Sequence, residues 1–170
     1  MARHLLSFLS LFFLQYFAIG QVKKSIPVFN PTGTYKLNNK TCTKDGDTYG
    51  YFGSIRVKLL NPGAIAVSLF VCVGAPSYNS GSFVDTLVYL HHRAVYHPAD
   101  YDTSCRITFY FTAKGVTVNQ VQADLNSGCG FGHAVLADWF YRKVSGKVPV
   151  IQDEALGVRS PRSAKFAIVD

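Results

Sequence analysis

The residues best suited to chemistry lie in one glycine-rich stretch, NSGCGFGH at positions 126–133. A thiol, a hydroxyl and an imidazole occur together there, so a Cys129–His133–Asp138 triad or a Ser127–His133 pair can be drawn. A hydrolase serine sits on a sharp turn between a strand and a helix, and no helical pattern follows here. A dinucleotide site is disfavoured as well, because its glycines must open a helix. Hydrolysis by Cys129 or Ser127 is therefore only a second alternative.

Binding is the chemistry that this stretch favours. Glycines allow positive φ and a close approach of the backbone to a partner, and a rigid loop loses less entropy when it binds. The structural interpretation, a tight crossover pinned by a disulfide, is favoured, and the functional interpretation is a rigid recognition loop with Phe131 as its exposed anchor. The tripeptide Asn-Ser-Gly recurs at 79–81, so a second loop could share the same mouth of the fold. The expected binding residues are Tyr78, Asn79, Ser80, Gly81, Ser127, Gly128, Gly130, Phe131, Gly132 and His133.

Histidines and carboxylates do not suggest a metal or acid–base site. Beyond the N-terminal segment the histidines are His91, His92, His97 and His133. Successive residues of a strand point to opposite faces, so His91 and His92 cannot both join the other two. Acidic residues are few, and no pair is spaced for glycoside chemistry. We expect no metal, no cofactor and no catalytic residue, and hence not an enzyme.

Alternating side chains predict a fold made of β-strands. Ile107, Phe109 and Phe111 alternate with polar neighbours, and the odd positions of 49–59 repeat that pattern. Residues 64–73 are apolar on both faces, as in a strand that is covered on its outer side or lines a cavity. A closing strand is expected at 134–143. About eight strands at roughly ten-residue spacing predict an all-β antiparallel meander barrel, with a sandwich as the second choice.

The N-terminus reads as an export signal. An apolar run follows Arg3 and ends in Ala18-Ile19-Gly20, with small residues where a signal peptidase cuts. The run is short for a membrane span, so an uncleaved anchor is the alternative, and we expect a periplasmic or secreted protein. The expected division is a signal peptide at 1–20, an extended leader at 21–31, a barrel at 32–144, and a tail at 145–170 that is disordered or packed outside.

Four cysteines in an exported chain are expected to form disulfides. In a hairpin, the end of the second strand lies beside the start of the first. Cys105 opens one expected strand and Cys129 follows the end of its expected partner, which favours Cys105–Cys129. The same argument, applied to the strand that ends near Cys72 and the loop that holds Cys42, favours Cys42–Cys72. The barrel would then be braced by two bridges.

The charge favours an anionic partner. The formal net charge is +7, which suits an acidic protein or a polyanionic polymer. The basic residues are scattered singly, so nucleic acid is not expected, and no later segment is long and apolar enough to span a membrane. The leading expectation is an exported, non-enzymatic binding protein that uses loops at the barrel mouth to hold a protein or polymer. The alternative, suggested by abundant aromatic residues and the two-sided apolar strand, is a lipocalin-like carrier of a small apolar ligand.

Several short motifs resemble a family of small, uncharacterised exported bacterial β-barrel proteins. The motifs are GTY at 33–35, GYFG at 50–53, GSFVDTL at 81–87, SCRITF at 104–109, GVTV at 115–118 and SGCGFG at 127–132. The resemblance extends to about Lys143 and implies no activity. More loosely, a disulfide-bearing barrel with a Ser-Gly loop is similar to the periplasmic lysozyme inhibitors, which press such a loop into the lysozyme cleft. Because many lysozymes are basic, a basic barrel would be repelled by them, and an inhibitor-like role would need an acidic target.

Overall fold

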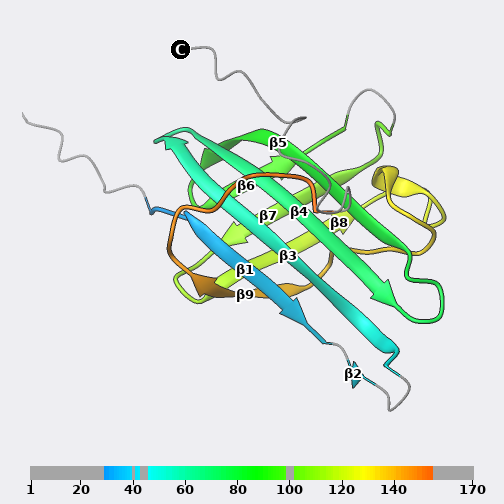
Figure 1. Cartoon of the computed structure of the whole chain (residues 1–170). Helices are drawn as coiled ribbons and strands as arrows, with labels where there is room; N and C mark the ends of the chain where they lie inside the picture. The colour runs from blue at the N-terminus through cyan, green and yellow to red at the C-terminus, as the bar shows by residue number, and fades with distance from the viewer. Residues whose placement is uncertain (1–28, 40, 43–45, 99–101, 155–170) are drawn as a thin grey trace, which may run out of the picture.

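Across the described residues, regular structure is β-strand almost throughout (Figure 1). A computed structural model describes residues 29–39, 41–42, 46–98 and 102–154. The strands are β1 (Gly33–Asn38), β2 (Thr41–Cys42), β3 (Thr48–Asn61), β4 (Ala64–Gly74), β5 (Ser80–Leu90), β6 (Arg93–Tyr96), β7 (Arg106–Phe111), β8 (Gly115–Val121) and β9 (Phe140–Ser145), and Gly128–Gly130 form a single 3₁₀ turn, η1. The expected signal peptide, the leader up to residue 28 and the tail from residue 155 lie outside the described residues.

The sheet closes on itself. Each barrel strand pairs antiparallel with its predecessor in the chain, and β1 pairs with both β3 and β9. Eight strands therefore form a closed meander barrel. The short β2 pairs antiparallel with the first residues of β3. Closure removes the exposed edges that an open sheet would present. The predicted barrel is confirmed, and the sandwich is not formed. Within the described residues, no helix has the length and apolarity needed to cross a bilayer.

Alternation places the predicted residues in the barrel interior. Ile55 and Val57 of β3 are fully buried, as are Ile107 and Phe109 of β7. Aromatic rings pack across the interior; those of Phe83 and Tyr96, for example, stack with their centroids 3.7 Å apart. The inward side chains of eight strands form one continuous hydrophobic core. Burial of such side chains is the main favourable term in folding.

The apolar outer face of β4 is explained by a segment that lies over it. Residues 146–154 leave β9 and cross the outside of β3 and β4, as the orange trace of Figure 1 shows. Arg56 on β3 holds this segment, because its guanidinium lies 2.6 Å from Glu154 and donates to the carbonyl of Val150. Ser68, the cross-strand partner of Arg56 on β4, is buried. The described part of the tail therefore packs outside the barrel, as one of the two predicted alternatives stated.

The closing strand begins later than the sequence predicted. β9 starts at Phe140, and the residues before it form loops. Side-chain hydrogen bonds between this loop and β8 take the place of the missing strand pairing. The backbone amide of Gln120 donates to the Asp138 carboxylate, and the backbone amide of Ala137 donates to the side-chain oxygen of Gln120. The apolar alternation of 134–139 reflects packing against the barrel end, which a period-two pattern does not distinguish from a strand.

Three tyrosines, Tyr35, Tyr89 and Tyr141, are buried inside the barrel. The hydroxyl of Tyr35 donates to the carbonyl of Pro31, and that of Tyr89 donates to the carbonyl of Phe29. The end of the leader is thereby fixed across one end of the barrel. Burial raises the pKa of Tyr89 to about 12 and raises the pKa of Tyr35 and Tyr141 still further.

These tyrosines make the fold sensitive to alkali. An unfolded tyrosine loses its proton near pH 10, whereas the buried phenols keep theirs, so the folded state binds more protons above that pH. The free energy of unfolding should therefore be unaffected by these groups below about pH 10 and should fall as the pH rises from about 10 towards 12. Urea unfolding curves at pH 8 to 11.5 measure this. The Tyr89→Phe variant should show a shallower fall, and a wild-type curve without any fall would contradict the assignment.

Candidate functional site

The structure brings the two predicted loops together at one end of the barrel. We call residues 78–81 and 127–133 the rim. The amide of Gly132 donates to the carbonyl of Ser80 over 2.9 Å, and the side-chain amide of Asn79 donates to the carbonyl of His133 over 3.0 Å. The repeated Asn-Ser-Gly tripeptide thus marks two segments that lie side by side.

Phe131 is not the exposed anchor that the sequence predicted. Its side chain is only 4% exposed and belongs to the hydrophobic core. The ring lies against Gly81 so closely that a Cβ at that position would overlap it. Gly81 therefore makes room for this ring, and the exposed side chains at the rim include Tyr78 and His133.

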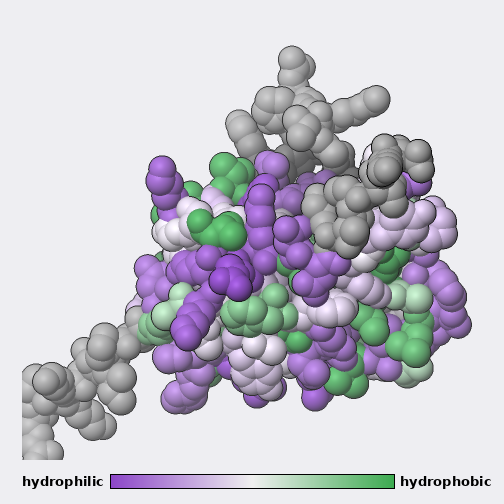
Figure 2. Space-filling model, turned by 90° about the horizontal axis from the view of Figure 1, so that it is seen from below, coloured by the Kyte–Doolittle hydropathy of each residue, from purple (hydrophilic) through white to green (hydrophobic). Residues whose placement is uncertain are grey.

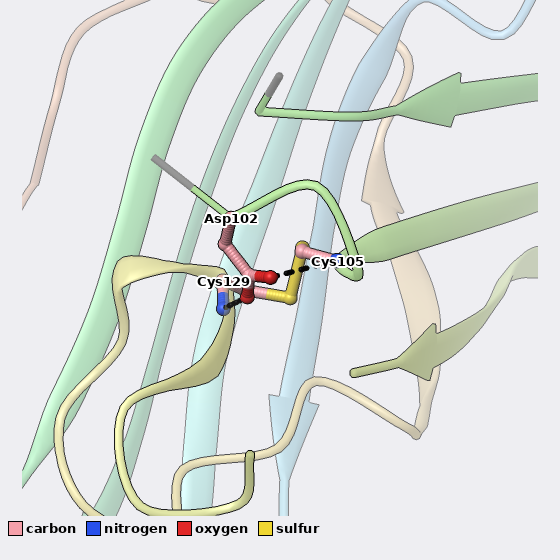
Figure 3. A group of neighbouring side chains, drawn as sticks. All are labelled: Asp102, Cys105 and Cys129. Carbon is pink, nitrogen blue, oxygen red and sulfur yellow. Dashed lines mark hydrogen bonds between the residues drawn. A yellow bond between two sulfur atoms is a disulfide. The ribbon is translucent and has the colours of Figure 1, made fainter. Parts of the chain in front are cut away.

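A disulfide and a carboxylate fix the base of the rim. Cys105 and Cys129 are bonded with their Cα atoms 5.0 Å apart, which confirms the predicted pairing (Figure 3). The carboxylate of Asp102 accepts hydrogen bonds from the backbone amides of Cys105 (3.1 Å) and Cys129 (2.6 Å). It also accepts from the hydroxyl and amide of Ser104. The Ser104 hydroxyl and the Cys129 amide lower the pKa of Asp102, so the carboxylate stays ionised and holds both cysteine segments.

The arrangements drawn for hydrolysis are not assembled. The Cys129 sulfur is in the disulfide and is not available as a thiolate nucleophile. The hydroxyl of Ser127 donates to Asp124 over 2.9 Å, not to His133, and Asp138 accepts from the amide of Gln120. These side chains bind the loops to one another, so their role here is structural.

The second predicted disulfide, Cys42–Cys72, is not formed, because Cys72 is a free, buried thiol. The strand register gives the reason. Cys42 lies opposite Thr48 near the start of β3, whereas Cys72 lies opposite Phe52, further along the same strand. The side chain of Cys42 itself lies outside the described residues.

The histidines are dispersed over the barrel. His91 and His92 form the β5–β6 turn, both with positive φ, while His133 lies at the rim at the opposite end. His97 Nδ1 lies 2.6 Å from the carbonyl oxygen of Cys105. Among the described residues, the only group of three potential metal ligands is Asp102 with the two disulfide sulfurs. Bonded sulfurs are not thiolate ligands, so that group is a structural clamp.

A groove on the outside of the barrel is the feature that sequence reasoning missed. It has a volume of about 1030 Å³ and lies over the outer faces of β9, β1, β3 and β4. Its apolar lining is aromatic, and its basic lining comes from two strands that are far apart in the chain. The lining includes Phe52, Phe70, Trp139, Phe140, Lys36 and Arg142. Figure 2, seen from the side on which β9 and β1 lie in Figure 1, shows a largely hydrophilic surface with separate apolar side chains.

Two cations face each other in this groove. Lys36 and Arg142 are direct cross-strand partners in the β1–β9 ladder, and both are exposed. Like charges in that position oppose folding by roughly 0.2 to 1 kcal/mol. Within the part of the chain that the structure describes, neither forms an ion pair, whereas nearby Arg56 is neutralised by Glu154. The groove therefore presents two positive charges beside aromatic walls, and its lining also contains the Glu154 carboxylate that pairs with Arg56.

Comparisons of the chain with family models, with curated proteins and with solved structures found no match. The function is therefore argued from the geometry of the groove and the rim.

Proposed function

We propose that this protein is a non-enzymatic binding protein that holds an anionic protein or polymer partner in the outer groove. The observation that supports it most is the direct opposition of Lys36 and Arg142, while Glu154, the acidic residue that the described lining contains, is paired with Arg56. A bound anion would relieve their mutual repulsion, and the guanidinium can pair with a carboxylate or phosphate through two hydrogen bonds. The groove's volume of about 1030 Å³ lies at the upper limit of ligand sites, which are about 300 to 1,000 Å³.

The groove suits an anionic partner better than the rim does. The rim stands over two carboxylates, Asp102 and Asp124, whose pKa values are both lowered, so both are ionised at neutral pH. The largest cause of the lowered pKa of Asp102 is a hydrogen bond from the Ser104 hydroxyl. For Asp124 it is a hydrogen bond from the backbone amide of Asn126. Negative charge at the rim would repel an anionic partner. We therefore keep the expected binding role, but we place the binding site in the groove on the barrel wall and not at the loops of the rim.

Export remains part of this proposal. A disulfide persists in an oxidising compartment and is rare in a reducing cytosol, so the Cys105–Cys129 bridge favours a periplasmic or secreted protein. The lipocalin-like alternative receives less support, because rings such as Phe109 and Phe111 occupy the space inside the barrel that an apolar ligand would need.

The single tryptophan provides the test, since Trp139 lines the groove. Titration with polygalacturonate or poly-L-glutamate should change its fluorescence and yield a dissociation constant. Lys36→Gln and Arg142→Gln should each weaken binding by about tenfold, or 1.4 kcal/mol, because each removes one charge-assisted contact. The loss should shrink in 0.5 M salt, where the screening length is shorter than at physiological ionic strength.

Matched controls separate the groove from general charge. Lys114→Gln removes one positive charge from an exposed turn at the end of the barrel and should leave the dissociation constant within about twofold. Tyr78→Ala and His133→Ala test the rim. Equal losses for Lys114→Gln and the groove variants would mean non-specific attraction, and a loss confined to the rim variants would place the site there.

A further inference from the structure

The end of the barrel opposite the rim carries exposed apolar side chains. Val88 is 68% exposed, Leu90 is 59% exposed and Leu60 is 42% exposed, and Tyr110 is exposed beside them. These side chains lie at or next to the β3–β4, β5–β6 and β7–β8 turns. Single exposed apolar residues are ordinary, whereas a group of them marks an interaction surface. We call Lys58, Leu60, Val88, Leu90, Arg93 and Tyr110 the hairpin patch.

The strand register makes the hairpin patch continuous. Ala64 at the start of β4 pairs with Asn61, next to Leu60, and with Val88 on its other side. Leu90 lies opposite Arg93, and Arg93 lies opposite Tyr110.

Cations are part of this surface. Lys58 lies two residues before Leu60 on β3, next to the irregularity in the β3–β4 ladder between Leu59 and Asn61. The guanidinium carbon of Arg93 lies 5.8 Å from the centroid of the Tyr110 ring. The patch thus combines two cations, on β3 and β6, with apolar side chains on β3, β5 and β7.

The charges of the barrel are unevenly distributed: four of the seven described carboxylates lie at the rim, whereas Asp85 of β5 and Asp153 and Glu154 of the segment over β3 and β4 do not. Residues 56–66, 86–96 and 106–119, which form the hairpins of this end, contain no Asp or Glu. Lys114 and Lys147 add further positive charge, and His91 and His92 form the β5–β6 turn. Four carboxylates lie instead beside the strand ends at the rim: Asp47, Asp102, Asp124 and Asp138. The described chain also begins at the hairpin end, where the ring of Phe29 packs 5.0 Å from that of His92.

We propose that the hairpin patch docks on an anionic lipid surface. Leucine and valine side chains at turn tips can enter the boundary between headgroups and acyl chains, and tyrosine suits that boundary because it is apolar with a polar tip. The surrounding lysines and arginines lie at the level of the anionic headgroups, which attract them. The acidic rim then faces away from the lipid. This role goes beyond the proposed binding groove and uses different residues.

Vesicle cosedimentation tests the proposal. The purified protein is mixed with vesicles of phosphatidylcholine alone or with 30% phosphatidylglycerol, and the bound fraction is measured. We expect binding to the anionic vesicles at least tenfold tighter than to the neutral ones. Leu60→Ser/Leu90→Ser and Lys58→Gln/Arg93→Gln should each reduce it at least tenfold, because insertion and headgroup attraction are both needed. Inorganic phosphate at 10 mM should not displace the protein, whereas displacement would assign the site to a free anion and overturn the proposal.

The controls address folding and specificity. Val121→Ser/Leu125→Ser removes two exposed apolar residues near the rim and should sediment like the wild type. Lys36→Gln/Arg142→Gln should also sediment like the wild type, so failure of the groove proposal would not affect this one. Thermal unfolding midpoints confirm that each variant is folded. If the double leucine variant binds as tightly as the wild type, or if neutral vesicles bind equally well, the proposal is wrong.

Discussion

Replacing Phe131 by alanine is expected to lower the free energy of unfolding by about 3 to 5 kcal/mol. The ring is buried in the core and lies against Gly81, so its removal leaves a cavity that the rigid rim cannot easily fill. The backbone around it is fixed by the Cys105–Cys129 bridge, which limits collapse of the loop. Urea unfolding at neutral pH measures the loss.

Leu125→Ala is the matched control, because this side chain is in the neighbouring loop and is 61% exposed. Its effect should stay within about 0.5 kcal/mol, as for most surface substitutions. If Phe131→Ala cost less than about 1 kcal/mol and instead weakened capture of a partner, the ring would be a surface anchor and its burial would be wrong.

Removal of the disulfide is expected to have an effect of similar size. The Cys105→Ser/Cys129→Ser variant should lose about 3 to 4 kcal/mol of stability, because the bridge closes a loop between residues 24 apart and so restricts the unfolded chain. Wild-type protein in dithiothreitol should lose a similar amount. The double variant should unfold at the same urea concentration with and without the reductant.

Cys72→Ala distinguishes this bridge from the pairing that the sequence also suggested. Cys72 is a free thiol, so the reductant should destabilise Cys72→Ala as much as it destabilises the wild type. A smaller effect of reductant on Cys72→Ala than on the wild type would indicate that Cys72 takes part in a disulfide in solution.

Strand pattern and hairpin geometry could be predicted from the sequence because both are local properties. The alternation in β3 and β7 shows which residues face inward, and a strand has only two faces to choose from. The Cys105–Cys129 pairing was predictable for a related reason, since β7 and β8 form one hairpin and Cys129 follows shortly after it. The repeated Asn-Ser-Gly tripeptide suggested either that the two loops are neighbours or that the repeat is a coincidence of turn-forming residues, and hydrogen bonds show that the loops are neighbours.

Side chains beyond the strand ends could not be placed in this way. Phe131 follows a run of glycines, and no periodicity there shows whether its ring turns inward or outward. The Cys42–Cys72 pairing was predicted wrongly for a similar reason. It depended on the register of β3, and along that strand the two cysteines lie opposite residues that are four positions apart, Thr48 and Phe52.

The sequence by itself determined the β class, the approximate number of strands, the inward face of strands such as β3 and β7, and one disulfide, because each follows from neighbours along the chain. Only the tertiary structure decided which strands meet when the barrel closes. That closure sets Lys36 of β1 against Arg142 of β9, more than a hundred residues later in the chain, and it gathers Leu60, Val88 and Leu90 at one end. Cross-strand neighbours depend on register and closure, which are properties of the whole sheet, so no single stretch of sequence contains them.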